Sequence, residues 1–126
     1  MDAQQELFIK LKTRIGQQGY TVYDGALPPE GTPYPFVYMG STQQDDRMLK
    51  AGVIGAVSQM IHVYHNDVRQ RGSVSGILTT IKAVCRSITS TEHFSWQCTG
   101  IDQQILPDNT TKTPLMHGII TADFIY

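Results

Sequence analysis

Four histidines are the residues in this sequence best suited to binding a metal ion or transferring a proton. His62 and His65 stand three positions apart in an expected strand, so their side chains point to opposite faces and cannot share one ion unless the strand bulges. His93 and His117 lie near the last two expected strands, where they could face each other across a hairpin. Neither pair has a cysteine or carboxylate at ligand spacing beside it. We therefore expect structural histidines, no bound metal and no cofactor.

Nucleophilic and carboxylate chemistry has no better support. Cys85 or Cys98 with a histidine could form a nucleophile–base pair, but the sequence offers neither a glycine-framed turn nor oxyanion donors. We interpret both cysteines as core-facing thiols, with a disulfide or a redox role as the alternative. Asp45 and Asp46 are adjacent carboxylates in a polar segment that would not desolvate them, so raised pKa values are not expected. These patterns indicate a protein that is not an enzyme.

Hydrophobic periodicity predicts the elements that position these residues. Helices are expected over residues 2–18, with Asp2 as N-cap, and over Ser73–Ile88, with Ser73 as N-cap. Strands are expected over residues 20–23, 36–40, 57–65, 94–98 and 115–126. The order α-β-β-β-α-β-β, mostly with hairpin-length connections, indicates an α+β fold. We expect a mainly antiparallel sheet of about five strands with two helices packed on it, in one domain spanning residues 1–126.

Two connecting segments stand out. Residues 27–35 contain Pro28, Pro29, Pro33 and Pro35, which predicts an ordered loop; a motif for proline-binding modules is the alternative. Residues 41–56 are polar at first and then small and apolar, and they allow either a long protruding loop or a hairpin arm.

The closing strand predicts spare apolar surface on the sheet. Its even positions are core-like, whereas its odd positions form a mixed face that contains Ile119, Thr121 and Ile125. Two helices can cover one face of such a sheet, so we expect a neighbouring subunit to cover part of the other. The alternatives are that the helices straddle both faces, or that residues 41–56 fold back as a lid.

Composition limits the partners. Ten basic and eleven acidic side chains nearly cancel, so no strong field draws the protein to nucleic acid or to an anionic membrane. Charged residues make up only 17% of the chain, and the uncharged polar surface that remains suits protein–protein contact. No apolar run approaches the length of a membrane span, and the polar N-terminus does not resemble a secretory signal. We expect a soluble cytoplasmic product.

Several short patterns, taken in order, resemble the tail-completion, or tail-to-head joining, proteins of long-tailed bacteriophages and prophages. An N-terminal helix is followed by the turn Tyr23-Asp24-Gly25 and by a proline-rich approach to a strand, Pro33-Tyr34-Pro35-Phe36-Val37. A second strand, residues 60–64, leads into the long helix, and His117-Gly118 lies inside the final strand. The likeness covers nearly the whole chain.

The resemblance implies a tail-terminator-like α+β domain that assembles as a ring, commonly a hexamer. Such a ring caps the tail tube, docks to the head connector and lets DNA pass without specific binding. It would be assembled in the host cytoplasm and reside in the virion, at the head–tail interface. The rivals are a head-side neck or connector protein and, from another class, a small ligand-binding or enzymatic α+β domain.

We expect contacts with sister copies and partners on three parts of the chain. Residues 41–56 are expected to become ordered when a neighbour is present, and deletion of residues 43–50 should leave a folded monomer that forms no rings. The expected contact residues are Gln43, Gln44, Asp45, Asp46, Arg47 and Lys50 in that segment, Ile119, Thr121 and Ile125 on the closing strand, and Arg69 and Arg71 before the second helix.

Overall fold

The structure is a computed structural model that describes residues 2–49, 52–109 and 114–126. In these residues the chain forms two helices and a five-stranded sheet, and the order α-β-β-β-α-β-β is the predicted one. The α+β fold is therefore confirmed. The elements are α1 (Ala3–Gly16), β1 (Val22–Asp24), β2 (Phe36–Leu49), β3 (Gly52–His65), α2 (Arg71–Ser87), β4 (Gln97–Asp108) and β5 (Leu115–Ile125).

The sheet has the strand order β1-β2-β3-β5-β4 and is antiparallel except at one edge. There β1 pairs in parallel with Val37–Met39 of β2. The proline-rich loop accounts for this exception, because it carries the chain from the end of β1 back to the level at which β2 begins. The connection between these strands is thus a return loop, which agrees with the ordered loop predicted for residues 27–35.

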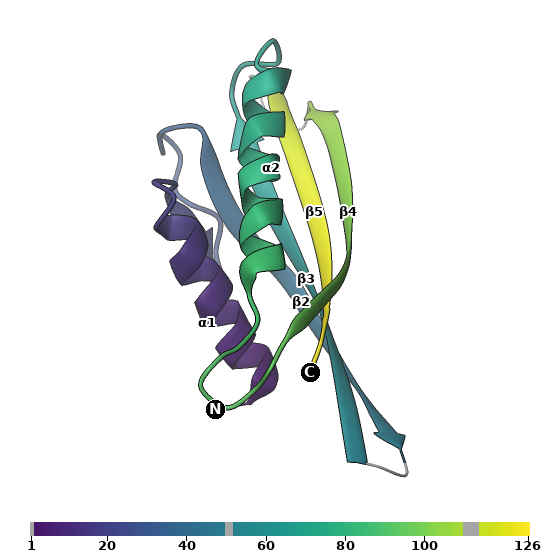
Figure 1. Ribbon diagram of the computed structural model, residues 1–126. Coiled ribbons are helices and arrows are strands. Elements are labelled where there is room, and N and C mark those ends of the chain that lie inside the picture. Colours follow the sequence, from purple (N-terminus) through teal and green to yellow (C-terminus); the bar gives the residue numbers. More distant parts are fainter. Residues whose placement is uncertain (1, 50–51, 110–113) are drawn as a thin grey trace.

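Both helices lie on the same face of the sheet (Figure 1). α2 packs against β5, β4 and β3, and α1 packs against β2, β1 and α2. The expectation that helices might straddle both faces is wrong, because the apolar stripes of both helices share one core with one face of the sheet. Fully buried members of this core are Leu7, Leu11, Ile15, Val74, Leu78, Ile81, Ile61, Val63, Ile120 and Phe124. We call the opposite side, which neither helix of the described residues covers, the open face.

The two helices begin differently. Asp2 caps α1 as predicted, because its Oδ1 accepts a hydrogen bond of 2.8 Å from the Gln5 amide. The predicted cap Ser73 is wrong: α2 begins at Arg71, after Gln70, which makes no side-chain cap. A hydrogen-bonded turn precedes the helix, in which the Gln70 amide donates to the Asp67 carbonyl at 2.9 Å.

Residues 41–49 and 52–56 form a hairpin arm. β2 and β3 stay in antiparallel register from Thr42↔Gln59 to Leu49↔Gly52, after a bulge between Met39 and Thr42. The arm projects beyond the helices and does not fold back over the sheet, so the loop and lid alternatives are wrong (Figure 1). The described part of the arm is paired as two strands of the same chain, and its ordering by a neighbour stays a prediction.

The fourth strand begins later than predicted. Residues 94–96 precede it, and β4 runs over Gln97–Asp108, so that Pro107 lies within the strand. Proline is tolerated there because β4 is an edge strand, where one row of backbone amides needs no partner in the sheet.

Candidate assembly surface

The structure brings several of the predicted contact residues onto the open face. Period-two alternation and the observed register place Gln43 and Asp45 of the arm on the same side of the sheet as Ile119, Thr121 and Ile125. The two arm residues are exposed and the three β5 residues are half-buried. One surface therefore runs from the centre of the sheet onto the arm.

Gln44 and Asp46 point the other way and serve a structural purpose. The Gln44 side-chain amide donates to the Tyr126 hydroxyl at 3.0 Å, and that hydroxyl donates to Asp46 Oδ1 at 3.0 Å. The Tyr126 ring also packs edge-on against Trp96, with ring centroids 4.9 Å apart. Gly55 makes room for this ring, because a Cβ there would lie 2.0 Å from Tyr126 Cζ. These contacts fasten the base of the arm to the core.

Arg69 and Arg71, two further predicted contact residues, do not join this surface. Arg47 pairs in register with Ile54 of the arm, and Lys50 lies outside the described residues. Arg69 and Arg71 are exposed in and after the β3–α2 connection, at the end of the molecule opposite the arm (Figure 1). Arg69 is 3.3 Å from Asp67, and its backbone and side-chain hydrogen bonds lower the pKa of that carboxyl.

A cluster of histidine and tyrosine side chains occupies the centre of the open face. His62 Nδ1 and His117 Nε2 are 2.8 Å apart and share a hydrogen bond. Tyr64 stacks on His117 with ring centroids 4.3 Å apart, and Tyr38 lies beside His62. Alternation along each strand identified this face, but only the β3–β5 register brings the two imidazoles together.

Burial shapes the ionisation of this cluster. The pKa of His62 is lowered because burial disfavours the imidazolium and because His117 is close. Burial also lowers the pKa of His117, although Asp108 acts in the opposite direction. The pKa of Tyr64 is raised, again mainly by burial. The neutral forms are favoured, so the centre of the open face is a polar but uncharged aromatic surface.

The suggested pairing of His93 with His117 is wrong. His93 lies in the loop before β4 and binds Glu6 of α1, with Nδ1 2.6 Å from Oε2 and the backbone amide 3.0 Å from Oε1. Burial acts to raise the pKa of Glu6, but the hydrogen bonds with His93 and Thr91 and the charge of His93 together outweigh burial, so the pKa is lowered. The contact joins α1 to the loop before β4, and its partners are too far apart in sequence for a local pattern to reveal it.

The cysteines differ in environment. Cys85 is buried in the core, and burial raises the pKa of its thiol to about 12. Cys98 packs against the same core from the edge strand but is only partly buried, and burial raises its pKa as well. Both thiols are free. The core-facing assignment thus holds fully for Cys85 and in part for Cys98.

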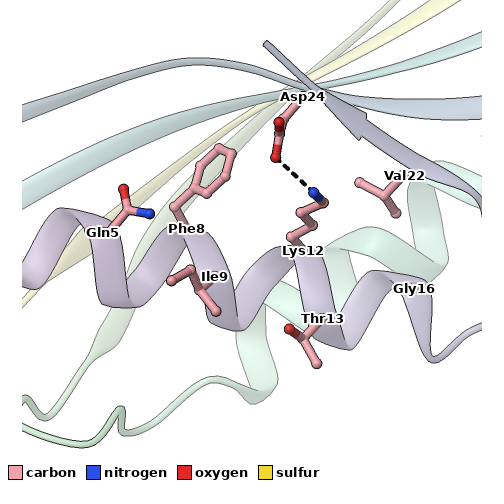
Figure 2. A pocket seen from close by; sticks show the side chains of 8 residues that line it. All are labelled: Gln5, Phe8, Ile9, Lys12, Thr13, Gly16, Val22 and Asp24. Carbon is pink, nitrogen blue, oxygen red and sulfur yellow. Dashed lines mark hydrogen bonds and ion pairs between the residues drawn. The ribbon is translucent and has the colours of Figure 1, made fainter. Parts of the chain in front are cut away.

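A shallow groove runs along the outer side of α1. Figure 2 shows Phe8 and Lys12 of α1 reaching toward β1, where Lys12 Nζ lies 2.8 Å from Asp24 Oδ2. Three neighbouring hollows, of about 500, 550 and 590 Å³, all have Phe8 in their lining. Together they extend from the ion pair to Gly40 and Thr42, at the foot of the arm.

The described residues offer neither a three-ligand metal site nor a membrane-spanning helix. These residues contain no group of three histidine, cysteine or acidic side chains placed to hold a metal ion. Neither of the helices they form is long and apolar enough to cross a bilayer.

Comparison with known proteins gives an informative likeness among solved structures. No protein-family model matches the sequence, and no curated protein matches it. Among solved structures, the chain is similar to a component of the virion of a native gene transfer agent particle, with a TM-score of 0.61 and 13% sequence identity. The match covers 98% of this chain and 95% of the other. At this identity the likeness shows a shared fold, which extends over nearly the full length of both chains.

Proposed function

We propose that this protein is a non-enzymatic structural component of a phage-like virion. In this role it forms a homo-oligomeric ring at the head–tail junction, completes or terminates the tail and joins it to the head. The observation that carries the proposal is the fold shared, almost end to end, with a component of a gene transfer agent virion. The resemblance of the sequence landmarks to tail-completion proteins supports the finer assignment.

The architecture suits such a role in two ways. Helices cover only one side of the sheet, so the open face, with Ile119, Thr121 and the His62–His117 pair, is free to be covered by another chain. The hairpin arm extends beyond the helices, and hydrogen bonds to Tyr126 hold its base in place. The arm can therefore protrude toward a partner from a fixed position. The partners on the two sides of the ring are the tail tube protein and the head connector.

Shortening the arm tests this function. Replacing residues 48–53 with Asn-Gly leaves the pair Arg47↔Ile54 flanking a two-residue turn and keeps the Tyr126 contacts. This change is gentler than deletion of residues 43–50, which would remove Gln44 and leave part of β3 unpaired. The shortened protein should unfold at the same denaturant concentration as the parent when both are dilute.

The parent protein should form closed rings in electron micrographs, alone when concentrated or when mixed with tail tubes, and should convert tails to a form that joins heads. The shortened variant should do neither, whereas Glu92→Gln, an exposed change in the loop before β4, should match the parent. A parent that stays monomeric under both conditions would contradict the proposal. Rings that bind head connectors but never tail tubes would favour the neck-protein alternative.

A further inference from the structure

The outer side of α2 and the open face carry opposite charges. α2 contains no acidic residue, and its basic residues are Arg71, Lys82 and Arg86. Alternation and register place three aspartates on the open face: Asp102, Asp108 and Asp123. No lysine or arginine whose side chain the structure describes lies on that face. The nearly balanced total charge of the chain is therefore divided between a basic helix and an acidic sheet face.

The basic residues of α2 lie at fixed heights along the sheet. Gly118 of β5 gives the reference, because a Cβ there would meet Val74 and Leu78 of α2. α2 runs beside β5 and rises about 1.5 Å per residue, against about 3.4 Å per residue along the strand (Figure 1). To within about one strand residue, this count sets Arg71 level with Leu115, Lys82 with Thr121 and Arg86 with Asp123.

The strand register brings the aspartates to the same heights. Asp108 pairs with Leu115, and Asp102 pairs with Thr121. Asp123 lies on β5 itself. Each basic residue of α2 therefore has an aspartate at its own level on the opposite side of the sheet.

The environment of Cys98 supports the match at the third level. Burial is the main cause that raises the pKa of this thiol, while Arg86 lowers it and Asp123 raises it further. Both charged groups therefore lie near Cys98, Arg86 on the helix side and Asp123 on the open face.

The open face has a hollow suited to a guanidinium group at the first of these levels. The hollow has a volume of about 360 Å³, and its lining includes the aromatic residues Tyr34, Phe36 and Tyr64 and the acidic residues Glu30 and Asp108. The ring centroids of the two neighbouring aromatic pairs are each 5.3 Å apart. Aromatic faces and carboxylates both attract a cation, and arginine is the side chain that most often uses the two together.

The exposed surface of α2 allows another sheet to approach closely. Its outermost side chains are small, and the residues concerned are Gly72, Ser73, Gly76, Thr79 and Ala83. A Cβ at either glycine would meet open space. Long basic side chains on the same helix can therefore reach past this low surface to a neighbouring molecule.

We infer that the outer side of α2 in one copy covers the open face of the next copy, so that the three basic residues meet the three aspartates. This inference rests on the proposed ring and names its contact. A copy rotated about an axis along the strands keeps its height, so the three levels stay matched from copy to copy. Because the two surfaces differ, the contact is head-to-tail and leaves neither surface uncovered once the ring closes.

Reversing the charges of one pair tests this contact. Asp102→Lys sets two lysines against each other at every contact, and Lys82→Asp sets two aspartates against each other. Each variant should need roughly tenfold more protein than the parent to form rings at low salt, and added salt should narrow the difference. Gln103→Lys is the control, because it adds a lysine at the next residue of β4, on the other side of the sheet, and should assemble like the parent. All three should unfold in urea like the parent when dilute.

The two defective variants should rescue each other. In an equimolar mixture, alternating copies join one lysine to one aspartate at every contact, so rings with an even number of copies should reappear in electron micrographs. A protein that carries both Asp102→Lys and Lys82→Asp should form rings of any number, because each contact then has the pair in reversed order.

Ring formation by either single variant at the parent's concentration would overturn the contact. Failure of the combined variant, or of the mixture when the parent ring has an even number of copies, would also overturn it and leave the proposed function intact. Asp102→Lys rings as stable as the parent's that no longer bind tail tubes would assign the open face to the tube protein instead. Absence of closed assemblies from the parent, alone or with tail tubes, would remove the proposed function and this contact with it.

Discussion

Replacement of Gly118 by alanine should destabilise the protein through overpacking between β5 and α2. A Cβ at this position would lie 2.9 Å from both Val74 Cγ1 and Leu78 Cδ1. Carbon atoms in favourable contact are about 3.5–4.0 Å apart, so the strand and the helix must separate or both side chains must move. Val74 is a β-branched residue in a helix and has little rotamer freedom with which to respond.

Overpacking of this kind costs about 1–3 kcal/mol. Alanine has less conformational entropy than glycine in the unfolded chain, which offsets roughly 0.4–1 kcal/mol of this loss in stability. The net loss should therefore be about 1–2 kcal/mol, or a fall in Tm of roughly 3–8 °C for a domain of this size. Urea unfolding of dilute protein, followed by fluorescence of the single buried tryptophan, Trp96, measures the change directly.

Gly76→Ala is the matched control. Gly76 lies in α2 with open space where its Cβ would be, so the same substitution should stabilise the protein by about 1 kcal/mol. Adding Val74→Ala to Gly118→Ala should cost less than Val74→Ala costs in the parent, because the smaller side chain relieves the clash. Equal stability of Gly118→Ala and the parent, or strict additivity in the double variant, would refute the packing argument.

Two further predictions concern the open face and the arm. The pKa values of His62 and His117 are lowered in the folded chain, so the unfolded chain binds more protons as the pH falls below 6.5. The free energy of unfolding should therefore keep its full value above that pH and decline below it. His117→Gln should weaken this pH dependence in urea titrations, and an unchanged slope would contradict it. Gly55→Ala must displace the Tyr126 ring and should cost about 1–3 kcal/mol. Tyr126→Phe keeps the ring and should cost only about 0.5–1.5 kcal/mol for each hydrogen bond lost. A larger loss of Tm for Tyr126→Phe than for Gly55→Ala would contradict the role assigned to the ring at the base of the arm.

Elements with a strong local pattern could be predicted from the sequence. The stripe that includes Val74, Ile77 and Ile81 has the period of a helix and few polar interruptions, and the structure buries all three residues. Alternation along the closing strand likewise separated the buried Ile120 from the half-buried Ile119. In both cases the burial of a side chain depends on its position within a single element.

Features that depend on register could not be predicted in this way. Alternation has the same period in every register, so it shows that His62 and His117 share a face but not that their rings meet. The contact between Gln44 and Tyr126 joins residues 82 positions apart. The start of β4 was misplaced because Phe94 and Trp96 alternate like strand residues, whereas they pack around Tyr126 before the strand begins.

The short strand β1 acts as a mechanical stop. It occupies the β2 edge only as far as Met39, and the Lys12–Asp24 ion pair holds its end against α1. Any further strand that paired along this edge would be halted where β1 begins to cover it. β1 therefore confines the exposed backbone hydrogen-bonding groups of β2 to the arm side of Met39. Three residues of parallel strand thus divide this border of the sheet into a shielded part and an accessible part.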